Sequence, residues 1–183
     1  MNQYKIIFTG PVGAGKTTAI TSISDKPPVK TEALTSDLSK NKKAETTVAM
    51  DYGIMNVNGG EKIHLYGTPG QERFDFMWNI LTTGGVGLIL LLDNTRADPF
   101  LDMTYFLDAF SAFIKETNVA IGVTQTDLSQ SPSIESYREQ LKQLGINSPV
   151  FSVDARVKND ISLLVQSLLY SFSLDPRLEE NLV

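Results

Sequence analysis

Apolar and polar positions follow two different periods along this chain, and the two periods alternate. Short apolar runs typical of strands lie at residues 4–9, 48–57, 61–66, 86–92, 119–123 and 149–153. Apolar residues spaced three or four positions apart predict helices over residues 17–24, 71–81, 100–115, 134–144 and 161–172. Strands that alternate with helices predict parallel strands joined by crossover helices, so we expect an α/β fold.

Two connections depart from this alternation. Asn58, Gly59 and Gly60 separate two of the runs, and their tolerance of positive φ favours an antiparallel hairpin. Residues 29–46 are polar without a clear period, and we expect a long loop there. The loop is either simply solvated or a docking surface for an acidic partner, because five lysines crowd the region: Lys26, Lys30, Lys40, Lys42 and Lys43. The predicted sheet has six strands, mostly parallel with one antiparallel strand, and helices on both faces.

Composition narrows the function classes. A chain of 183 residues that is 42% hydrophobic and 20% charged suits one globular domain over residues 1–183. With no cysteine and one histidine, His64, a disulfide, a catalytic thiol or a histidine-based metal site is not expected. The net charge of −5 argues against a general nucleic-acid binder. Without a signal peptide pattern or a lipidation motif, we expect a soluble cytoplasmic protein with no membrane anchor.

A phosphate-binding motif lies between the first predicted strand and the first predicted helix. The match to G-x-x-x-x-G-K-[ST] is Gly10-Pro11-Val12-Gly13-Ala14-Gly15-Lys16-Thr17. Glycines allow backbone N–H groups to surround a polyphosphate, and the helix adds the positive end of its dipole. The motif predicts that Lys16 reaches the β- and γ-phosphates and that the Thr17 hydroxyl is a ligand of Mg²⁺. The alternative, an ordinary glycine-rich turn, does not explain Lys and Thr in register.

Three further segments follow predicted strands at the same edge of the sheet, residues 68–72, 124–127 and 154–156. With the loop, they resemble in order the nucleotide-contact motifs of Ras-like small GTPases over nearly the whole chain. The segment most similar to that family's second switch is Thr68-Pro69-Gly70-Gln71-Glu72-Arg73-Phe74. The subgroup that the chain looks most like is the bacterial, non-lipidated MglA type. The resemblance implies a P-loop NTPase fold and a single G domain.

The resemblance also implies a role for each matching residue. Lys16 and Gln71 would be catalytic, with Gln71 orienting the attacking water. Thr17 and Thr47 would hold Mg²⁺, and Thr46 is an alternative register for Thr47. Asp127 would pair with the N1–H and amine of guanine, and the Ala155 N–H would meet the guanine oxygen. The implied nucleotide contacts are Gly10, Val12, Gly13, Ala14, Gly15, Lys16, Thr17, Thr18, Thr47, Gly70, Thr124, Gln125, Asp127 and Ala155.

Several of these residues also fit simpler roles. Gln71 fits an exposed polar residue at a helix start, and Asp127 fits a plain turn. The segment 154–156 fits an ordinary loop equally well. Two residues outside the motifs are expected to be structural: His64 as a half-exposed strand residue, and Asp93 as a loop or helix-cap residue.

Three positions depart from the family pattern. Gly67 stands where the second switch normally begins with an aspartate that holds a magnesium-bound water, and Asp51 on the neighbouring strand is a candidate substitute. Thr124 and Gln125 replace an Asn-Lys pair, and the shorter Thr124 predicts that the brace on the phosphate-binding loop is lost. Val12 replaces the glycine of Ras itself, and its bulk beside the γ-phosphate predicts slow intrinsic hydrolysis.

We therefore predict a molecular switch that binds GTP or GDP with Mg²⁺, hydrolyses GTP slowly and contacts effectors through its switch loops. The resemblance implies a GTPase-activating partner, for the bacterial subgroup a roadblock-type protein. The alternative, favoured by Gly67 and Val12, is a nucleotide-binding interaction module with negligible hydrolysis. A metabolic P-loop kinase or ATPase is a third reading, and the sequence shows no arginine-rich lid for it.

Overall fold

A seven-stranded sheet runs through the computed structural model, which describes residues 3–27, 29–36, 45–57, 61–70 and 77–173. The strands lie in the order β2-β3-β4-β1-β5-β6-β7. β3 is antiparallel to both of its neighbours, and the other pairings are parallel. The α/β prediction of a mostly parallel sheet with one antiparallel strand is confirmed. The strands are β1 (Gln3–Thr9), β2 (Val29–Ser36), β3 (Glu45–Asn56), β4 (Lys62–Gly67), β5 (Gly87–Asp93), β6 (Val119–Thr124) and β7 (Val150–Ser152).

Strand β2 corrects the expectation of a long loop. Its eight residues pair antiparallel with the first part of β3, which begins at Glu45, three residues before the predicted start. As the edge strand, β2 needs a partner on one side only and no continuous apolar run, so the polar pattern did not reveal it. The described sheet therefore has seven strands where six were predicted. Lys40, Lys42 and Lys43 lie outside the described residues.

Six helices connect or follow these strands in the part of the chain that the structure describes. The predicted helix over residues 100–115 is two helices, divided at Phe110. The apolar pattern continues across the break because Phe110 stays buried against Trp78, with ring centroids 4.9 Å apart. Residues 71–76 of another predicted helix lie outside the described residues. The helices are α1 (Lys16–Ile23), α2 (Trp78–Thr82), α3 (Pro99–Ala109), α4 (Ser111–Glu116), α5 (Ile134–Gln143) and α6 (Lys158–Ser173).

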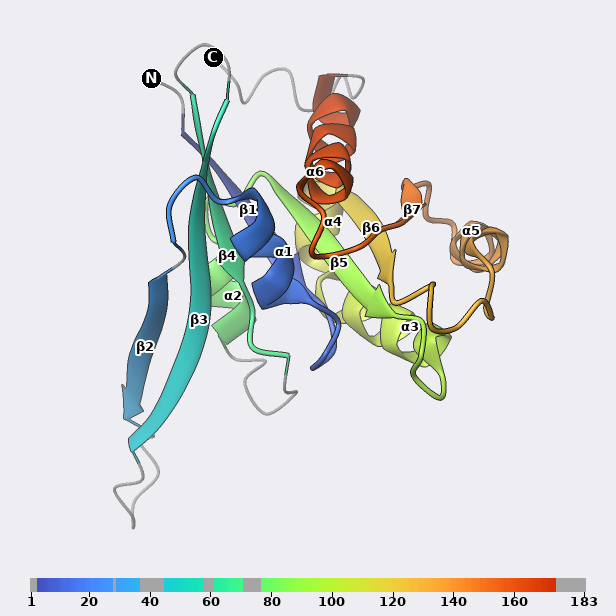
Figure 1. Ribbon diagram of the computed structural model, residues 1–183, viewed down its shortest axis with the longest axis horizontal. Coiled ribbons are helices and arrows are strands. Elements are labelled where there is room, and N and C mark those ends of the chain that lie inside the picture. Colours follow the sequence, from blue (N-terminus) through green and yellow to red (C-terminus); the bar gives the residue numbers. More distant parts are fainter. Residues whose placement is uncertain (1–2, 28, 37–44, 58–60, 71–76, 174–183) are drawn as a thin grey trace.

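The helices form a layer on each face of the sheet (Figure 1). Ile6 and Phe8 of β1 belong to the core that includes α1 and α6, whereas Ile7 belongs to the core that includes α3 and α5. Successive strand residues point to opposite faces, so one strand serves both cores. All residues of β5 and β6 are buried, as their continuous apolar runs predicted. No helix among the described residues is long and apolar enough to cross a membrane.

The parallel strands bring distant segments together at one edge. The carboxyl ends of β1, β4, β5, β6 and β7 point the same way, and the chain leaves each of them into a loop. The phosphate-binding motif and the three other predicted contact segments follow four of these ends. The topology therefore assembles the candidate site from residues separated by more than a hundred positions.

Candidate functional site

The loop after β1 folds back tightly because three glycines adopt positive φ. The φ angles are 139° at Gly10, 88° at Gly13 and 92° at Gly15. A Cβ at Gly10 would lie 2.0 Å from the Leu91 carbonyl oxygen, and one at Gly15 would lie 2.9 Å from the Ala155 Cβ. Both positions exclude a side chain, so the loop rests directly on β5 and on the loop after β7. Helix α1 then begins with its free N–H groups at this loop.

Lys16 is a buried cation inside this loop, with 8% of its surface exposed. Its Nζ donates hydrogen bonds to the carbonyl oxygens of Gly10 and Pro11, both at 2.7 Å. Burial lowers the pKa of Lys16 to about 8, and the carboxylate of Asp51 opposes this shift. Carbonyl oxygens satisfy the hydrogen bonds of an ammonium group without neutralising its charge. An anionic ligand in the loop would therefore be stabilised at this position.

The chain that follows β4 is anchored beside the same loop. The Thr68 N–H donates to the Phe8 carbonyl oxygen at 2.8 Å, and the Thr68 hydroxyl is hydrogen-bonded to that of Thr9 at 2.9 Å. Two residues later, a Cβ at Gly70 would lie 2.7 Å from Lys16 Nζ. Gly70 thus lies beside Lys16 and the backbone of Val12, and its predicted contact with the γ-phosphate stays a prediction. Gln71 lies outside the described residues.

The predicted metal ligands are not all brought together. The Thr17 hydroxyl donates to Asp51 Oδ2 at 2.5 Å. Thr47 lies four residues before Asp51 in β3, paired with Leu34 of β2, which places its backbone about 13 Å along the strand from Asp51. The structure therefore joins Thr17 to Asp51, while Thr47 and the neighbouring Thr46 lie farther along β3. The role of Thr47 stays a prediction.

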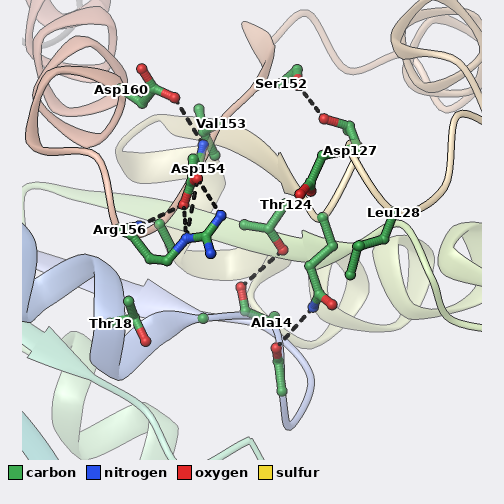
Figure 2. A pocket seen from close by; sticks show the side chains of 15 residues that line it. Ala14, Thr18, Thr124, Asp127, Leu128, Ser152, Val153, Asp154, Arg156 and Asp160 are labelled. Atoms are coloured by element: carbon green, nitrogen blue, oxygen red, sulfur yellow. Dashed lines mark hydrogen bonds and ion pairs between the residues drawn. The ribbon is translucent and has the colours of Figure 1, made fainter.

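A pocket of about 510 Å³ opens between this loop and the carboxyl ends of β6 and β7 (Figure 2). Residues of all three segments face it. Asp127 and Leu128 border it on one side, and Asp154 and Arg156 on another. It brings together eight of the predicted nucleotide contacts: Gly13, Ala14, Gly15, Thr18, Thr124, Gln125, Asp127 and Ala155.

The expectation that Thr124 cannot brace the phosphate-binding loop is wrong. Thr124 Oγ1 lies 3.1 Å from the Ala14 carbonyl oxygen and 3.0 Å from that of Leu92, and these two buried acceptors share its one hydroxyl hydrogen. The loop carbonyl comes close enough for the shorter side chain. Gln125 adds a second link, because its Nε2 donates to the Gly13 carbonyl oxygen at 3.3 Å. Its φ of 58° is a left-handed conformation that is uncommon for a residue with a side chain.

An ion pair at the mouth of the pocket was not expected from the sequence. The Arg156 guanidinium binds the Asp154 carboxylate through two nitrogens, with Nε–Oδ1 at 2.9 Å and Nη2–Oδ2 at 2.7 Å (Figure 2). These hydrogen bonds lower the pKa of Asp154 to about 2. The Asp154 N–H in turn donates to Asp160 Oδ2 at 2.9 Å. Ala155, between the paired residues, is buried against Gly15.

Asn94 is a second residue that sequence reasoning missed. It is almost fully buried, its Nδ2 donates to the Ser129 carbonyl oxygen at 2.6 Å, and its Oδ1 accepts from the Tyr137 hydroxyl at 2.7 Å. Burial raises the pKa of Tyr137. This network holds the loop that carries Asp127. The only sequence signal was a second polar residue, after Asp93, at the end of an apolar run.

The remaining expectations concern single residues. Asp93, expected in a loop or at a helix cap, is instead the last residue of β5, where its Oδ1 accepts hydrogen bonds from the Thr95 N–H and hydroxyl in the turn that follows. His64 is a half-buried strand residue whose Nδ1 is 2.7 Å from the Tyr52 hydroxyl. Val12 is 58% exposed at the tip of the phosphate-binding loop. Among the described residues, no group of three histidine, cysteine, aspartate or glutamate side chains could hold a metal.

Comparison with known proteins adds a family and distant relatives. A family model described as "Conserved hypothetical ATP binding protein" matches residues 26–170, a stretch that begins after the phosphate-binding loop. Ras-related protein Rab-27A of Rattus norvegicus is 26% identical over 182 residues, which cover 90% of this chain and 76% of that protein.

Two further relatives match over about half of the chain. Uncharacterized protein MJ1339 of Methanocaldococcus jannaschii is 30% identical over 95 residues, covering 52% of this chain and 54% of that protein. Ras-related protein RABA6b of Arabidopsis thaliana is 30% identical over 96 residues, covering 50% and 42%. The chain thus spans about half the length of these two relatives. Together with the α/β fold of this chain, these matches support nucleotide binding in a small-GTPase-like superfamily. The chain belongs to the family described as conserved hypothetical ATP binding proteins.

Proposed function

We propose that this protein is a guanine-nucleotide switch that binds GTP or GDP with Mg²⁺. The observation that carries the proposal is the shared pocket of Asp127 and the backbone of the phosphate-binding loop. A carboxylate accepts hydrogen bonds from both the N1–H and the amine of guanine. Adenine presents an acceptor at N1 and would leave the carboxylate unpaired, which costs a few kcal/mol.

The family description names ATP, so the choice of base is the central question. Thr124 and Gln125 connect the loop that carries Asp127 to the phosphate-binding loop, so that a nucleotide held by the phosphate-binding loop would meet the Asp127 carboxylate. Arg156 lies at the pocket mouth, where its planar guanidinium can stack on a bound base. Stacking is indifferent to the identity of the base, so Asp127 decides the selectivity.

Hydrolysis would be in-line attack of water on the γ-phosphorus, catalysed by position and charge. Lys16 would stabilise the charge that develops on the phosphate oxygens, together with the Gly70 N–H. Gln71 would orient the attacking water. The exposed side chain of Val12 lies at the loop tip, beside this reaction, and supports slow turnover without a partner protein.

The residues around Thr17 fit a magnesium ion. The Thr17 hydroxyl and the Asp51 carboxylate are hydrogen-bonded to each other, and both offer the hard oxygen ligands that Mg²⁺ prefers. Bound Mg²⁺ would supply positive charge against the phosphates. Thr17 would hold it, and Thr47 remains the predicted second ligand.

The proposed switch consists of the segments that contact the γ-phosphate. Gly70 lies against Lys16, so a γ-phosphate bound by Lys16 would lie next to this segment. Its presence or absence would then change the conformation of the segment. The conformation of this segment would then differ between the GTP-bound and GDP-bound forms, and effectors and a GTPase-activating protein would recognise one form over the other. A roadblock-type activator and the MglA-type subgroup are the most specific forms of this proposal, resting on the sequence resemblance alone.

The experiment identifies the nucleotide directly. Purified protein is denatured, and the released nucleotide is identified by chromatography; nucleotide-free preparations are titrated with the fluorescent analogues mant-GDP and mant-ADP. We expect guanine nucleotide, and its loss in Lys16→Ala but not in Lys115→Ala, which removes an exposed lysine of α4. Adenine nucleotide, or a preference for mant-ADP, would overturn the guanine assignment.

A second measurement tests the switch against the alternative of a non-hydrolysing module. Single-turnover phosphate release from bound GTP is followed with and without cell extract. Slow release that the extract accelerates is the expected result. No release under either condition would favour the module.

A further inference from the structure

Three aspartates line the pocket at the carboxyl ends of β6 and β7: Asp127, Asp154 and Asp160 (Figure 2). Asp160 Oδ2 accepts a hydrogen bond from the Asp154 N–H, and the Asp154 carboxylate binds the Arg156 guanidinium. Counting only residues that the structure describes, the Asp127 carboxylate has no hydrogen bond or ion pair. A ligand can therefore bind Asp127 without breaking an existing contact of that carboxylate.

Arg156 lines the same pocket and has the chemistry to compete with a ligand for Asp127. Its planar guanidinium presents pairs of parallel N–H donors that match a carboxylate. The N1–H and the amine of guanine form a similar pair of donors. The hydrogen bonds with Asp154 raise the pKa of Arg156, and the charge of Asp127 adds to this shift. Asp127 therefore already attracts the guanidinium that Asp154 holds.

The contacts of Asp154 and Arg156 fix the position of the guanidinium. Two nitrogens of the Arg156 side chain donate to the Asp154 carboxylate, and the Arg156 backbone N–H donates to Asp154 Oδ1 at 2.9 Å. Ala155, between the two residues, lies so close to Gly15 that a Cβ there would be 2.9 Å from the Ala155 Cβ. The ion pair is therefore tied to the phosphate-binding loop through the backbone.

We propose that Asp154 is a positioning residue that holds Arg156 away from Asp127 and thereby keeps Asp127 free for guanine; this inference rests on the proposed nucleotide function. When the charge of Asp154 is removed, Arg156 pairs with Asp127 and covers the oxygens that guanine needs. Guanine must then displace the guanidinium. Adenine offers no pair of donors to Asp127 and has nothing to displace, so the loss falls on guanine nucleotides selectively.

The first test removes the charge of Asp154 and keeps the shape of its side chain. In Asp154→Asn, Oδ1 still accepts from the Arg156 backbone N–H, but the ion pair is lost. Affinities for mant-GDP and mant-ADP are measured on nucleotide-free protein. We expect mant-GDP affinity to fall about fivefold, as for an exposed ion pair that competes, and mant-ADP affinity to change by less than about twofold. Glu135→Gln, which breaks the exposed pair with Arg138 on α5, is the matched control and is expected to change neither affinity.

A double-mutant cycle tests whether Arg156 is the competitor. In the Arg156→Gln background no guanidinium is left to reach Asp127, so adding Asp154→Asn is expected to change mant-GDP affinity by less than about twofold. Arg156→Gln alone is expected to keep the preference for mant-GDP over mant-ADP within about twofold, because stacking on the base does not distinguish guanine from adenine.

Three results would overturn the inference. The first is mant-GDP affinity in Asp154→Asn within about twofold of the unaltered protein. The second is an equal loss for mant-GDP and mant-ADP, which would show a purely structural role. The third is a loss that persists in the Arg156→Gln background.

Should Asp154→Asn fail to fold, Arg156→Gln decides. A lost preference for mant-GDP in that variant would make Arg156 itself the residue that selects the base and would overturn the inference, whereas a retained preference supports it. An unaltered protein that prefers mant-ADP would instead overturn the proposed function, so the two failures are distinguishable.

Discussion

The two ends of the candidate site are built in different ways. At the phosphate end, which is the loop from Gly10 to Thr17, backbone packs on backbone. Gly10 contacts the backbone of β5, and the Lys16 side chain is buried inside the loop. At the base end, solvent reaches the side chains that line the pocket: Leu128 is 72% exposed, and the Arg156 and Asp154 side chains are 73% and 36% exposed. In the proposed nucleotide site, phosphate binding would therefore be tied to the fold, whereas the choice of base would depend on a few replaceable side chains.

Removing the cation of the phosphate end is expected to have the largest effect on binding. Lys16→Ala removes charge-assisted hydrogen bonds to phosphate, each worth about 1.5–3 kcal/mol, so we expect nucleotide affinity to fall by about 100-fold or more. The free energy of unfolding of the nucleotide-free protein is not expected to fall, because burial disfavours this charge. Titration with fluorescent nucleotide and urea denaturation measure the two quantities. Equal affinity for both proteins would remove Lys16 from the site.

Gly10 tests how far the phosphate end depends on the fold. Gly10→Ala places a Cβ 2.0 Å from the Leu91 carbonyl oxygen at a φ of 139°, so backbone must move. We expect a loss of about 3 kcal/mol or more in the free energy of unfolding, measured in urea. Gly145→Ala is the matched control, since its φ is also positive, at 70°, with nothing within 4 Å of the new Cβ. A loss of about 1 kcal/mol is expected there; similar losses at both sites would refute the packing argument.

The acidity of Lys16 gives the phosphate end a pH dependence. Its pKa is lowered to about 8, so the neutral amine becomes the main form above pH 8. A bound polyphosphate favours the charged form of Lys16. Above pH 8, nucleotide binding therefore requires that the Lys16 amine take up a proton. Nucleotide affinity is therefore expected to fall about tenfold between pH 7 and pH 9. In Lys16→Arg the side chain stays charged from pH 7 to pH 9. The difference between the affinity–pH profiles of the unaltered protein and of this variant therefore reports the titration of Lys16.

Much of the phosphate end could be predicted from the sequence because its requirements are local. Glycines that need positive φ stand beside Lys16 and Thr17 in one motif, and a buried strand precedes them. Edge strand β2 and the break at Phe110 could not be predicted. The first depends on pairing with β3, and the second leaves the apolar pattern unchanged.

Contacts across the sheet were also beyond sequence reasoning. The approach of Thr124 to Ala14 joins residues 110 positions apart, and no spacing rule gives a distance of 3.1 Å. The contact between Asp51 and Thr17 depends on the register of β3 and on the place of α1 above the sheet. Such contacts are set by packing, which a pattern of residue types does not encode.

Thr124 connects the phosphate end to the base end of the candidate site. Of the four predictions, its substitution is expected to change nucleotide affinity least. Thr124→Val keeps the shape of the side chain but leaves the Ala14 and Leu92 carbonyl oxygens without this donor. We expect a loss of about 1–2 kcal/mol in the free energy of unfolding and a severalfold weaker binding of nucleotide. Thr126→Val breaks an exposed hydrogen bond to Ser152 and is expected to cost less than about 0.5 kcal/mol. If both valine variants behave alike, the phosphate and base ends are independent, and Thr124 does not couple them.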